Sequence, residues 1–305
     1  PGFLWPEFVG IFRIARRVYG KNPYDIVVAQ DPFGAGLVGR WLKKKLGIKL
    51  QINFHGDFWD NPHWLSERWY HRVYLWISKY TIARADAVRV MSDGQKQKLL
   101  QSGVTPQIIR VIATPVDISR FENFEAQASP DQKKLLEKLG KQTQSGGKKT
   151  VLWVGKDDKA KDLGTLYKAM RFIKLKSSPS YVSADSPPLK IRGGGGVMKY
   201  AYNNPNLITP LAPLTLRGEP EFESRTDKIR LWMLGVDKTP SDLVDMITGE
   251  GGVDSADLPA YYLASDLLVS SSSSESFGKV LVEAAACGRP VVSTATTGAK
   301  EIIAD

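Results

Sequence analysis

The 305-residue sequence has a single cysteine, Cys287, and only three histidines. One cysteine cannot form a disulfide within the chain, which fits a reducing, cytosolic compartment. The histidines, cysteine and carboxylates do not have the spacing of a metal site, and no apolar run reaches the roughly eighteen residues of a membrane-spanning helix. No charged-then-apolar leader follows Pro1. These absences exclude a disulfide framework and favour a cytoplasmic protein without a resident metal.

Positive charge is in excess, with a net value of +10 for the chain. Residues 1–125 hold 18 Lys and Arg against 11 Asp and Glu, and they include the run Lys43–Lys45. Such a surface suits an anionic partner, which could be a membrane surface, a phosphorylated acceptor or nucleic acid. A solvated basic face explains the charge equally well. The basic residues lack an interleaved aromatic platform, so we expect no nucleic acid.

Short apolar runs alternate with helical patterns along the first part of the chain. Strands are expected at residues 24–31, 49–57, 86–92 and 108–114, and one of the helices between them is expected at Trp64–Ala85. This alternation predicts a parallel sheet with helices on both faces. The pattern restarts at Thr150, so the sequence predicts a second α/β domain.

The expected domains are residues 1–121 and 150–305. Residues 122–149 are polar and rich in lysine, which predicts an interdomain linker with some helix. Two further polar stretches, residues 177–188 and 237–256, are expected to be surface-loop insertions in the second domain.

The segment from residue 271 to residue 303 carries the strongest functional pattern. A polar loop contains Glu275, and a helix is predicted from near Gly278 to about Ala286. A helix that opens after such a loop presents unpaired N–H groups and a positive dipole end, which suit a phosphate or sugar hydroxyls. Glu275 and Glu283 are eight residues apart, or about 12 Å along a helix, comparable to the distance between the two sugars of a nucleotide sugar. Spacing alone favours ordinary surface charges.

The complete segment resembles the donor-binding signature of the family 4 retaining glycosyltransferases, which have the GT-B fold. The matching elements, in chain order, are Glu275, Phe277-Gly278, Glu283, the run ACGRPVV, and Gly298 with Glu301. The resemblance implies two Rossmann-like domains whose parallel sheets face each other across a cleft.

An upstream run, VLWVGKDDKAKDLGTLYKAM, resembles the strand and loop in which this family holds the donor diphosphate with two basic residues. The matching positions are Lys156 and Lys161. The family more often has arginine at the first position, so the charge is kept while bidentate contact is lost. Asp162 stands where glycine is common, which makes the tightness of the loop a question for the structure. A solvated charge run is the alternative interpretation.

The first half is similar to the family in the runs FHGDFWDN, RADAVRVMSDG and IIRVIATPVDISRF. His55 falls where the family has a histidine that faces the cleft. A lone histidine at a strand end is otherwise more often structural than catalytic.

The resemblance implies an enzyme that transfers a hexose-like sugar from a nucleotide-diphosphate sugar to a hydroxyl of a glycan or lipid-linked acceptor, with retention of configuration. His55 and Glu275 would act near the transferred sugar. The implied donor-binding residues are Lys156, Lys161, Ser276, Phe277, Gly278, Lys279 and Glu283. No cofactor or metal is expected beyond the nucleotide sugar, because lysines meet the phosphates. Polysaccharide biosynthesis is the expected role, in the cytoplasm or peripherally on the inner face of the membrane.

Two other classes stay open, an inactive sugar-nucleotide-binding protein and, less favoured, a basic nucleic-acid-binding protein. The resemblance covers Tyr24–Phe121 and Thr150–Ile303. Neither the family's first strand with its glycine-rich loop nor its last helices have a counterpart here. We therefore expect a GT-B chain that lacks its first and last elements.

Overall fold

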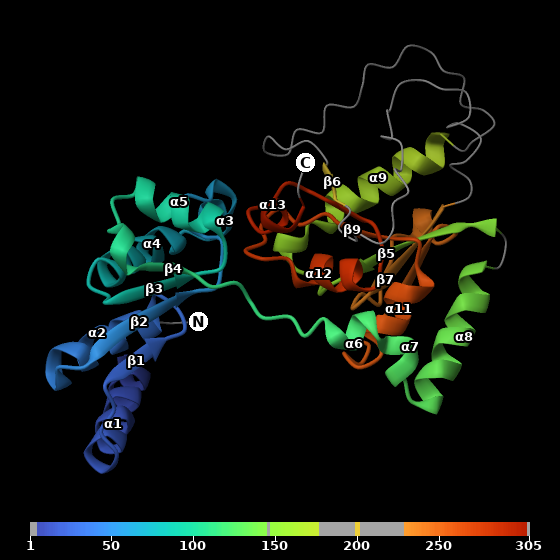
Figure 1. Cartoon of the computed structure of the whole chain (residues 1–305). Coiled ribbons are helices and arrows are strands. Elements are labelled where there is room, and N and C mark those ends of the chain that lie inside the picture. Colours follow the sequence, from blue (N-terminus) through green and yellow to red (C-terminus); the bar gives the residue numbers. More distant parts are fainter. Residues whose placement is uncertain (1–4, 145–146, 177–198, 202–228, 304–305) are drawn as a thin grey trace. The chain divides into compact units, whose positions relative to one another are not determined.

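A computed structural model describes residues 5–144, 147–176, 199–201 and 229–303 (Figure 1). The chain forms two compact units, Pro1–Thr114 with Glu275–Phe277, and Pro115–Ser274 with Gly278–Asp305. Each unit contains a sheet of mainly parallel strands. The prediction of two α/β units with parallel sheets is therefore confirmed.

The first unit is a parallel sheet in the order β1-β2-β3-β4 with helices between successive strands. Its elements are α1 (Trp5–Lys21), β1 (Ile26–Ala29), α2 (Gly34–Leu46), β2 (Lys49–Phe54), α3 (Pro62–Glu67), α4 (His71–Ile82), β3 (Ala87–Val90), α5 (Asp93–Gln101), the 3₁₀ turn η1 (Pro106–Ile108) and β4 (Ile109–Val111). Strand β2 forms the centre of the core, because Leu50, Ile52 and Phe54 are almost fully buried. The four strands match the four that the sequence predicts in this half.

The continuous helix expected over Trp64–Ala85 is wrong, because α3 and α4 are separate helices that break at residues 68–70. Nδ1 of His71 lies 2.6 Å from the carbonyl oxygen of Trp64, and the two rings stack with centroids 4.0 Å apart. This contact joins α3 to the start of α4 across the break. The aromatic residues keep a helical period across it, so the sequence pattern does not reveal it.

The second unit has a sheet in the order β6-β10-β9-β5-β7-β8, in which β6 is antiparallel to β10 and the other pairs are parallel. Its elements are α6 (Ser119–Glu122), α7 (Phe124–Gln127), α8 (Pro130–Gln144), β5 (Lys149–Val154), η3 (Lys159–Lys161), α9 (Leu163–Lys176), β6 (Lys199–Ala201), β7 (Ile229–Leu234), η5 (Ser241–Leu243), β8 (Ile247–Glu250), α11 (Leu258–Ala264), β9 (Leu267–Ser270), α12 (Lys279–Ala286), β10 (Val291–Ser293) and α13 (Ala299–Ile302). The limits of α12 confirm the helix predicted from near Gly278 to about Ala286.

Residues 122–149 are not a free linker, because they contain α7 and α8, which pack on the second unit. Phe124 and Leu139 are 5% and 3% exposed and belong to the same core as β9 and α12. Leu135 and Leu136 pack against this core from the same helix as Leu139. The lysines of α8 occupy the outer face of an amphipathic helix. Because they are numerous, the overall composition of the segment is polar although one face of the helix is apolar.

Residues 237–256 are not a loop insertion throughout, since β8 lies within them and pairs with β7. Leu243, Met246 and Ile247 are buried in the core beside that strand. The strand has four residues, and so short an apolar signal is easily lost among polar neighbours. The other expected insertion, residues 177–188, lies outside the described residues.

The order of the described strands in the second sheet reverses beside β5. Of the described strands after β5, β7 and β8 lie on one side of it, whereas β9, β10 and the edge strand β6 lie on the other. In open parallel sheets, ligands bind outside the carboxyl ends of the strands at such a reversal, because the loops there diverge. A ligand-binding site is therefore expected at the loops that follow β5 and β9.

Candidate functional site

Hydrogen bonds join the loop after β5 to the loop after β9. The Ser271 hydroxyl donates to the carbonyl oxygen of Lys161 at 2.8 Å, and the Ser273 N–H donates to that of Ala160, also at 2.8 Å. The two strands are parallel neighbours, so both loops leave the same edge of the sheet. The serine-rich segment that precedes α12 thereby holds the backbone of the lysine-bearing loop, although the bonded residues Ser271 and Lys161 are 110 positions apart.

The two predicted phosphate-binding lysines lie on the loop after β5. Lys156 is exposed, and Lys161 is half-buried at the end of η3. Asp158 closes this turn, since its carboxylate accepts from the Lys161 N–H at 3.1 Å. The loop is thus ordered by its own side chain and by the serines from β9, with two cationic side chains on it.

Asp162 adopts the backbone conformation that the glycine common at this position would permit. Its backbone has φ +43° and ψ +58°, which is the left-handed region, and aspartate tolerates that region better than most residues do. Its carboxylate accepts from the Thr165 N–H at 3.2 Å and from the Thr165 hydroxyl at 2.7 Å, so it caps the start of α9. The loop keeps the tight conformation that glycine permits and gains a cap.

The ends of β5 and β7 approach each other closely beside this loop. Gly235 has φ +87°, and a Cβ there would lie 2.0 Å from the carbonyl oxygen of Gly155. Sequence reasoning did not single out either glycine, although each directly follows a predicted buried strand. Any side chain at Gly235 would force these strand ends apart.

The N-cap of helix α12 is Gly278, which has φ +83° and no side chain to cap the helix. Lys279 is its first residue, so a positive side chain joins the positive end of the helix dipole. Such a start can bind an anion. Glu275, Ser276 and Phe277 lie in the loop before Gly278 and group with the first unit.

Glu283 is not a surface charge. It is the fifth residue of α12 and only 8% exposed. The hydroxyl of Tyr262, on α11, donates to Glu283 Oε2 at 2.9 Å, and Tyr262 is fully buried. Burial, followed by the charge of Glu283, raises the pKa of Tyr262 well above its ordinary value, so the phenol keeps its proton. Tyr262 was not recognised from the sequence, because no local pattern links positions 21 residues apart.

His55 lies in the first unit, directly after β2. Its Nε2 is 3.0 Å from Oε1 of Gln30, and that oxygen also accepts from Asn53 Nδ2 at 3.1 Å. A carboxamide oxygen cannot donate, so Nε2 carries the proton and Nδ1 is left as an acceptor in the neutral ring. Burial, followed by the charge of Arg89, lowers the pKa of His55, which favours this neutral ring. Gln30, which fixes the tautomer, was not recognised from the sequence.

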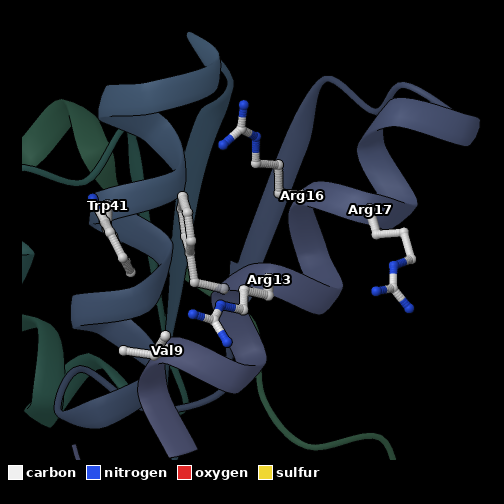
Figure 2. A pocket seen from close by; sticks show the side chains of 6 residues that line it. Val9, Arg13, Arg16, Arg17 and Trp41 are labelled. Atoms are coloured by element: carbon white, nitrogen blue, oxygen red, sulfur yellow. The ribbon is translucent and has the colours of Figure 1, made fainter. Parts of the chain in front are cut away.

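A basic surface lies on the first unit, where α1 packs against α2. A hollow of about 570 Å³ is lined by Val9, Phe12, Arg13, Arg16, Arg17 and Trp41 (Figure 2). Phe12 stacks on Trp41 with ring centroids 3.6 Å apart. In the lysine run, Lys43 pairs with Asp86 at 2.7 Å, whereas Lys44 and Lys45 are exposed.

The described residues contain no group of three or more His, Cys, Asp or Glu side chains placed to hold a metal ion. None of the helices in the described ranges is both long enough and apolar enough to cross a membrane.

Comparison with known proteins identifies both parts of the chain. Residues 2–120 match the model of Glycosyltransferase Family 4, and residues 242–305 match that of Glycosyl transferases group 1. Alpha-monoglucosyldiacylglycerol synthase of Streptococcus pneumoniae is 22% identical over 96% of this chain and 57% of its own length. D-inositol 3-phosphate glycosyltransferase of Salinispora arenicola is 40% identical over 80 residues, which cover 23% of this chain and 18% of that protein.

Solved structures share the fold. Anabaena HepE, in complex with UDP and glucose, superposes with a TM-score of 0.62 at 17% identity, over 98% of this chain and 65% of HepE. The chain thus spans between half and two thirds of the length of these two full-length matches. The two family models, the relatives and the pair of parallel sheets agree with the resemblance that the motifs carry. The chain belongs to the family 4 glycosyltransferases and has their GT-B fold.

Proposed function

We propose that this protein transfers a sugar from a nucleotide-diphosphate sugar to an acceptor hydroxyl, with retention of anomeric configuration. The observation that carries the proposal is the position of the two donor motifs. They follow β5 and β9, which flank the reversal of strand order, and hydrogen bonds join their loops. A bound nucleotide sugar would then meet both motifs at one edge of the sheet.

In the proposed site, positive groups meet the diphosphate. Lys156, Lys161 and the start of α12 at Phe277–Gly278 stabilise the negative charge that develops as the diphosphate leaves, where electrostatic stabilisation has its largest effect. Ser276 and Lys279 lie next to that helix start in sequence. The charge is supplied by side chains and a helix dipole, so the proposal includes no metal or other cofactor.

Two carboxylates and one histidine complete the proposed assignments. Glu283 accepts hydrogen bonds from the ribose hydroxyls, and Glu275 accepts them from the hydroxyls of the donor sugar. The acceptor oxygen forms a bond to the anomeric carbon while the bond to the diphosphate breaks, and the hydroxyl proton passes to an oxygen of the departing diphosphate. His55 contacts the transferred sugar or the acceptor through Nδ1. The acceptor is a glycan or lipid-linked hydroxyl, as family membership suggests.

A transfer assay tests the proposal and separates it from an inactive nucleotide-sugar-binding protein. Radiolabelled nucleotide sugars are incubated with the protein and with glycan and glycolipid acceptors, and Glu283→Ala serves as the matched variant. Loss of hydrogen bonds to a charged acceptor costs about 1.5–3 kcal/mol, so we expect donor affinity to fall at least tenfold. Binding without transfer would favour the inactive class. An unchanged dissociation constant in Glu283→Ala would remove that residue from the site.

We also infer that the α1–α2 surface of the first unit binds an anionic membrane surface. Arg13, Arg16 and Arg17 project from α1 (Figure 2), and Ile11 and Ile14 on the same helix are 52% and 63% exposed. Basic side chains beside exposed apolar ones suit the headgroup region of an anionic bilayer. Such contact would hold the protein where lipid-linked acceptors lie.

Vesicle flotation tests this surface. Each basic residue near an anionic membrane contributes about 1 kcal/mol, so replacing all three arginines by glutamine should weaken binding to phosphatidylglycerol vesicles more than tenfold. A matched loss of charge on α8, at the exposed Lys133, Lys134 and Lys138, should change little. Equal effects of both triple variants would assign the binding to net charge instead of to this surface.

A further inference from the structure

Glu283 and Tyr262 form an isolated polar pair inside the core of the second unit. Tyr262 and α12 residues such as Leu281 belong to one buried apolar cluster. Within the described residues, Tyr262 is the hydrogen-bond partner of the Glu283 carboxylate through Oε2 at 2.9 Å, and no other described group bonds to Oε1. A buried polar group normally has its hydrogen-bonding capacity satisfied. One half of this carboxylate is therefore fixed by the protein, and the other half is available to a ligand.

The direction of the hydrogen bond is fixed by chemistry. An ionised carboxylate only accepts hydrogen bonds, and Tyr262 retains its proton because burial and the nearby Glu283 raise its pKa. The other titratable group beside Glu283 is Cys287, at the end of α12. Burial raises the pKa of that thiol to about 12, so it stays neutral at neutral pH. Among the described side chains, the Tyr262 hydroxyl is thus the donor to Glu283, and Arg289 acts electrostatically on Cys287.

We propose that Tyr262 is a positioning residue of the donor site, whose hydroxyl holds Oε2 of Glu283 so that Oε1 is presented to the hydroxyls of the bound nucleotide. This inference rests on the proposed function, in which Glu283 binds the donor. The phenol restricts rotation of the carboxylate about its last bond.

Removal of the hydroxyl has a consequence that a purely structural residue would not produce. Without the Tyr262 hydroxyl, the Glu283 carboxylate can rotate about its last bond, and ordering it on binding lowers the net affinity for the nucleotide. The free energy of unfolding should change no more than it does when another buried tyrosine hydroxyl is removed. At neutral pH the affinity should fall roughly tenfold.

The experiment is calorimetry at neutral pH with UDP, repeated with GDP and ADP, on the whole chain. Urea unfolding of each variant separates a change in nucleotide affinity from a change in stability. Tyr261→Phe is the matched control. Tyr261 is the neighbouring buried tyrosine on α11, and its hydroxyl donates to Glu250 at 2.8 Å. Both variants lose one buried hydroxyl, but only Tyr262→Phe should lower the affinity for the nucleotide.

The outcomes separate the two proposals. If Glu283→Ala binds all three nucleotides as the parent does, the donor role of Glu283 fails. If Glu283→Ala weakens binding while Tyr262→Phe keeps the parental affinity, the role of Tyr262 is overturned. Equal weakening in both tyrosine variants also overturns it, because general packing would explain the loss.

A second variant keeps the inference testable if Tyr262→Phe does not fold. Glu283→Asp retains the charge but withdraws the carboxylate by one methylene, so it cannot reach the Tyr262 hydroxyl and the ligand together. We expect Glu283→Asp to bind as weakly as Glu283→Ala. Parental affinity in Glu283→Asp would show that the carboxylate needs no fixed position, and would overturn the inference.

Discussion

The charged residues of the candidate site occupy two different environments. Lys156 and Lys161 lie on a loop and are at least partly exposed, whereas Glu283 is almost fully buried. An exposed cation contributes long-range attraction to a phosphate and tolerates small displacements. A buried carboxylate depends on geometry, because it must offset the cost of its own desolvation. The two kinds of residue should therefore respond differently to conservative substitution.

We expect Lys156→Ala and Lys161→Ala each to lower kcat by about tenfold to a hundredfold, in the lower range for loss of one preorganised charge-stabilising group. Lys156→Arg should retain most activity, because the family often has arginine there and the charge is preserved. Steady-state kinetics of sugar transfer measure both effects. Lys159→Ala is the control, since Lys159 is exposed on the same loop and has no assigned contact with the donor. Parental turnover in the double variant of Lys156 and Lys161 would show that the diphosphate lies elsewhere.

At the scale of elements, the loop between β5 and α9 is shaped by side chains that its sequence places at close intervals. Asp158 and Asp162 each accept a backbone N–H three residues ahead, which is the usual reach of a capping side chain. Ser271 and Ser273 add long-range support from the loop after β9. The loop is therefore held at both ends before any ligand binds, which reduces the entropy lost on binding.

Substitution of Asp162 should separate its two contributions. Asp162→Asn keeps a capping oxygen and tolerates the left-handed backbone, so we expect little change. Asp162→Ala loses the cap and keeps the unfavourable backbone, which should cost about 1–2 kcal/mol in the free energy of unfolding. Asp162→Gly loses the cap but relieves the backbone, so it should lie between them. Urea unfolding measures this order. Equal stability of the alanine and glycine variants would contradict a left-handed residue at this position.

At the scale of the whole molecule, each unit has its own core, and the second core is larger than the sequence suggests. It includes α6, α7 and α8, which lie before the predicted start of the second domain. Phe121 and Phe124 are buried against α11 and α12, and Phe121 packs edge-on to Tyr262. The core around the Tyr262–Glu283 pair therefore includes Phe121, from the end of the expected first domain, and Phe124, from the expected linker.

Phe124→Ala should therefore destabilise the second unit. Truncation of a buried phenylalanine costs about 3–5 kcal/mol, whereas Phe172→Ala, at a side chain on α9 that is 39% exposed, should cost less than about 1 kcal/mol. Calorimetric unfolding measures both variants. Similar losses in the two would mean that α7 does not belong to the core, and residues 122–149 would return to being a linker.

The features that could be predicted from the sequence are those that depend on residues close together in the chain. The strands of the first sheet, and β5, β7, β9 and β10 of the second, come from short apolar runs, whereas the four-residue β8 was missed among its polar neighbours. The limits of α12 follow from Gly278 and Gly288, because glycine readily adopts the left-handed backbone found at both positions. The donor motifs were recognised because their residues are close together in sequence. The helical spacing of the aromatic residues from Trp64 to Tyr80 is also a local pattern. It does not reveal the break between α3 and α4, because that break depends on the contact of Trp64 with His71.

Other features were decided only by tertiary structure. The burial of Glu283 depends on Tyr262, the tautomer of His55 depends on Gln30, and the position of Lys161 depends on Ser271. Each pair joins residues far apart in the chain, and each becomes adjacent only when strands and helices have packed. The sequence by itself therefore determined the family, the two parallel sheets and the residues of the donor motifs. Packing decided that Glu283 is buried, that the loop after β5 is bonded to the serines after β9, and that the second core begins at α6. Burial and long-range hydrogen bonds exist only between elements that have already packed together.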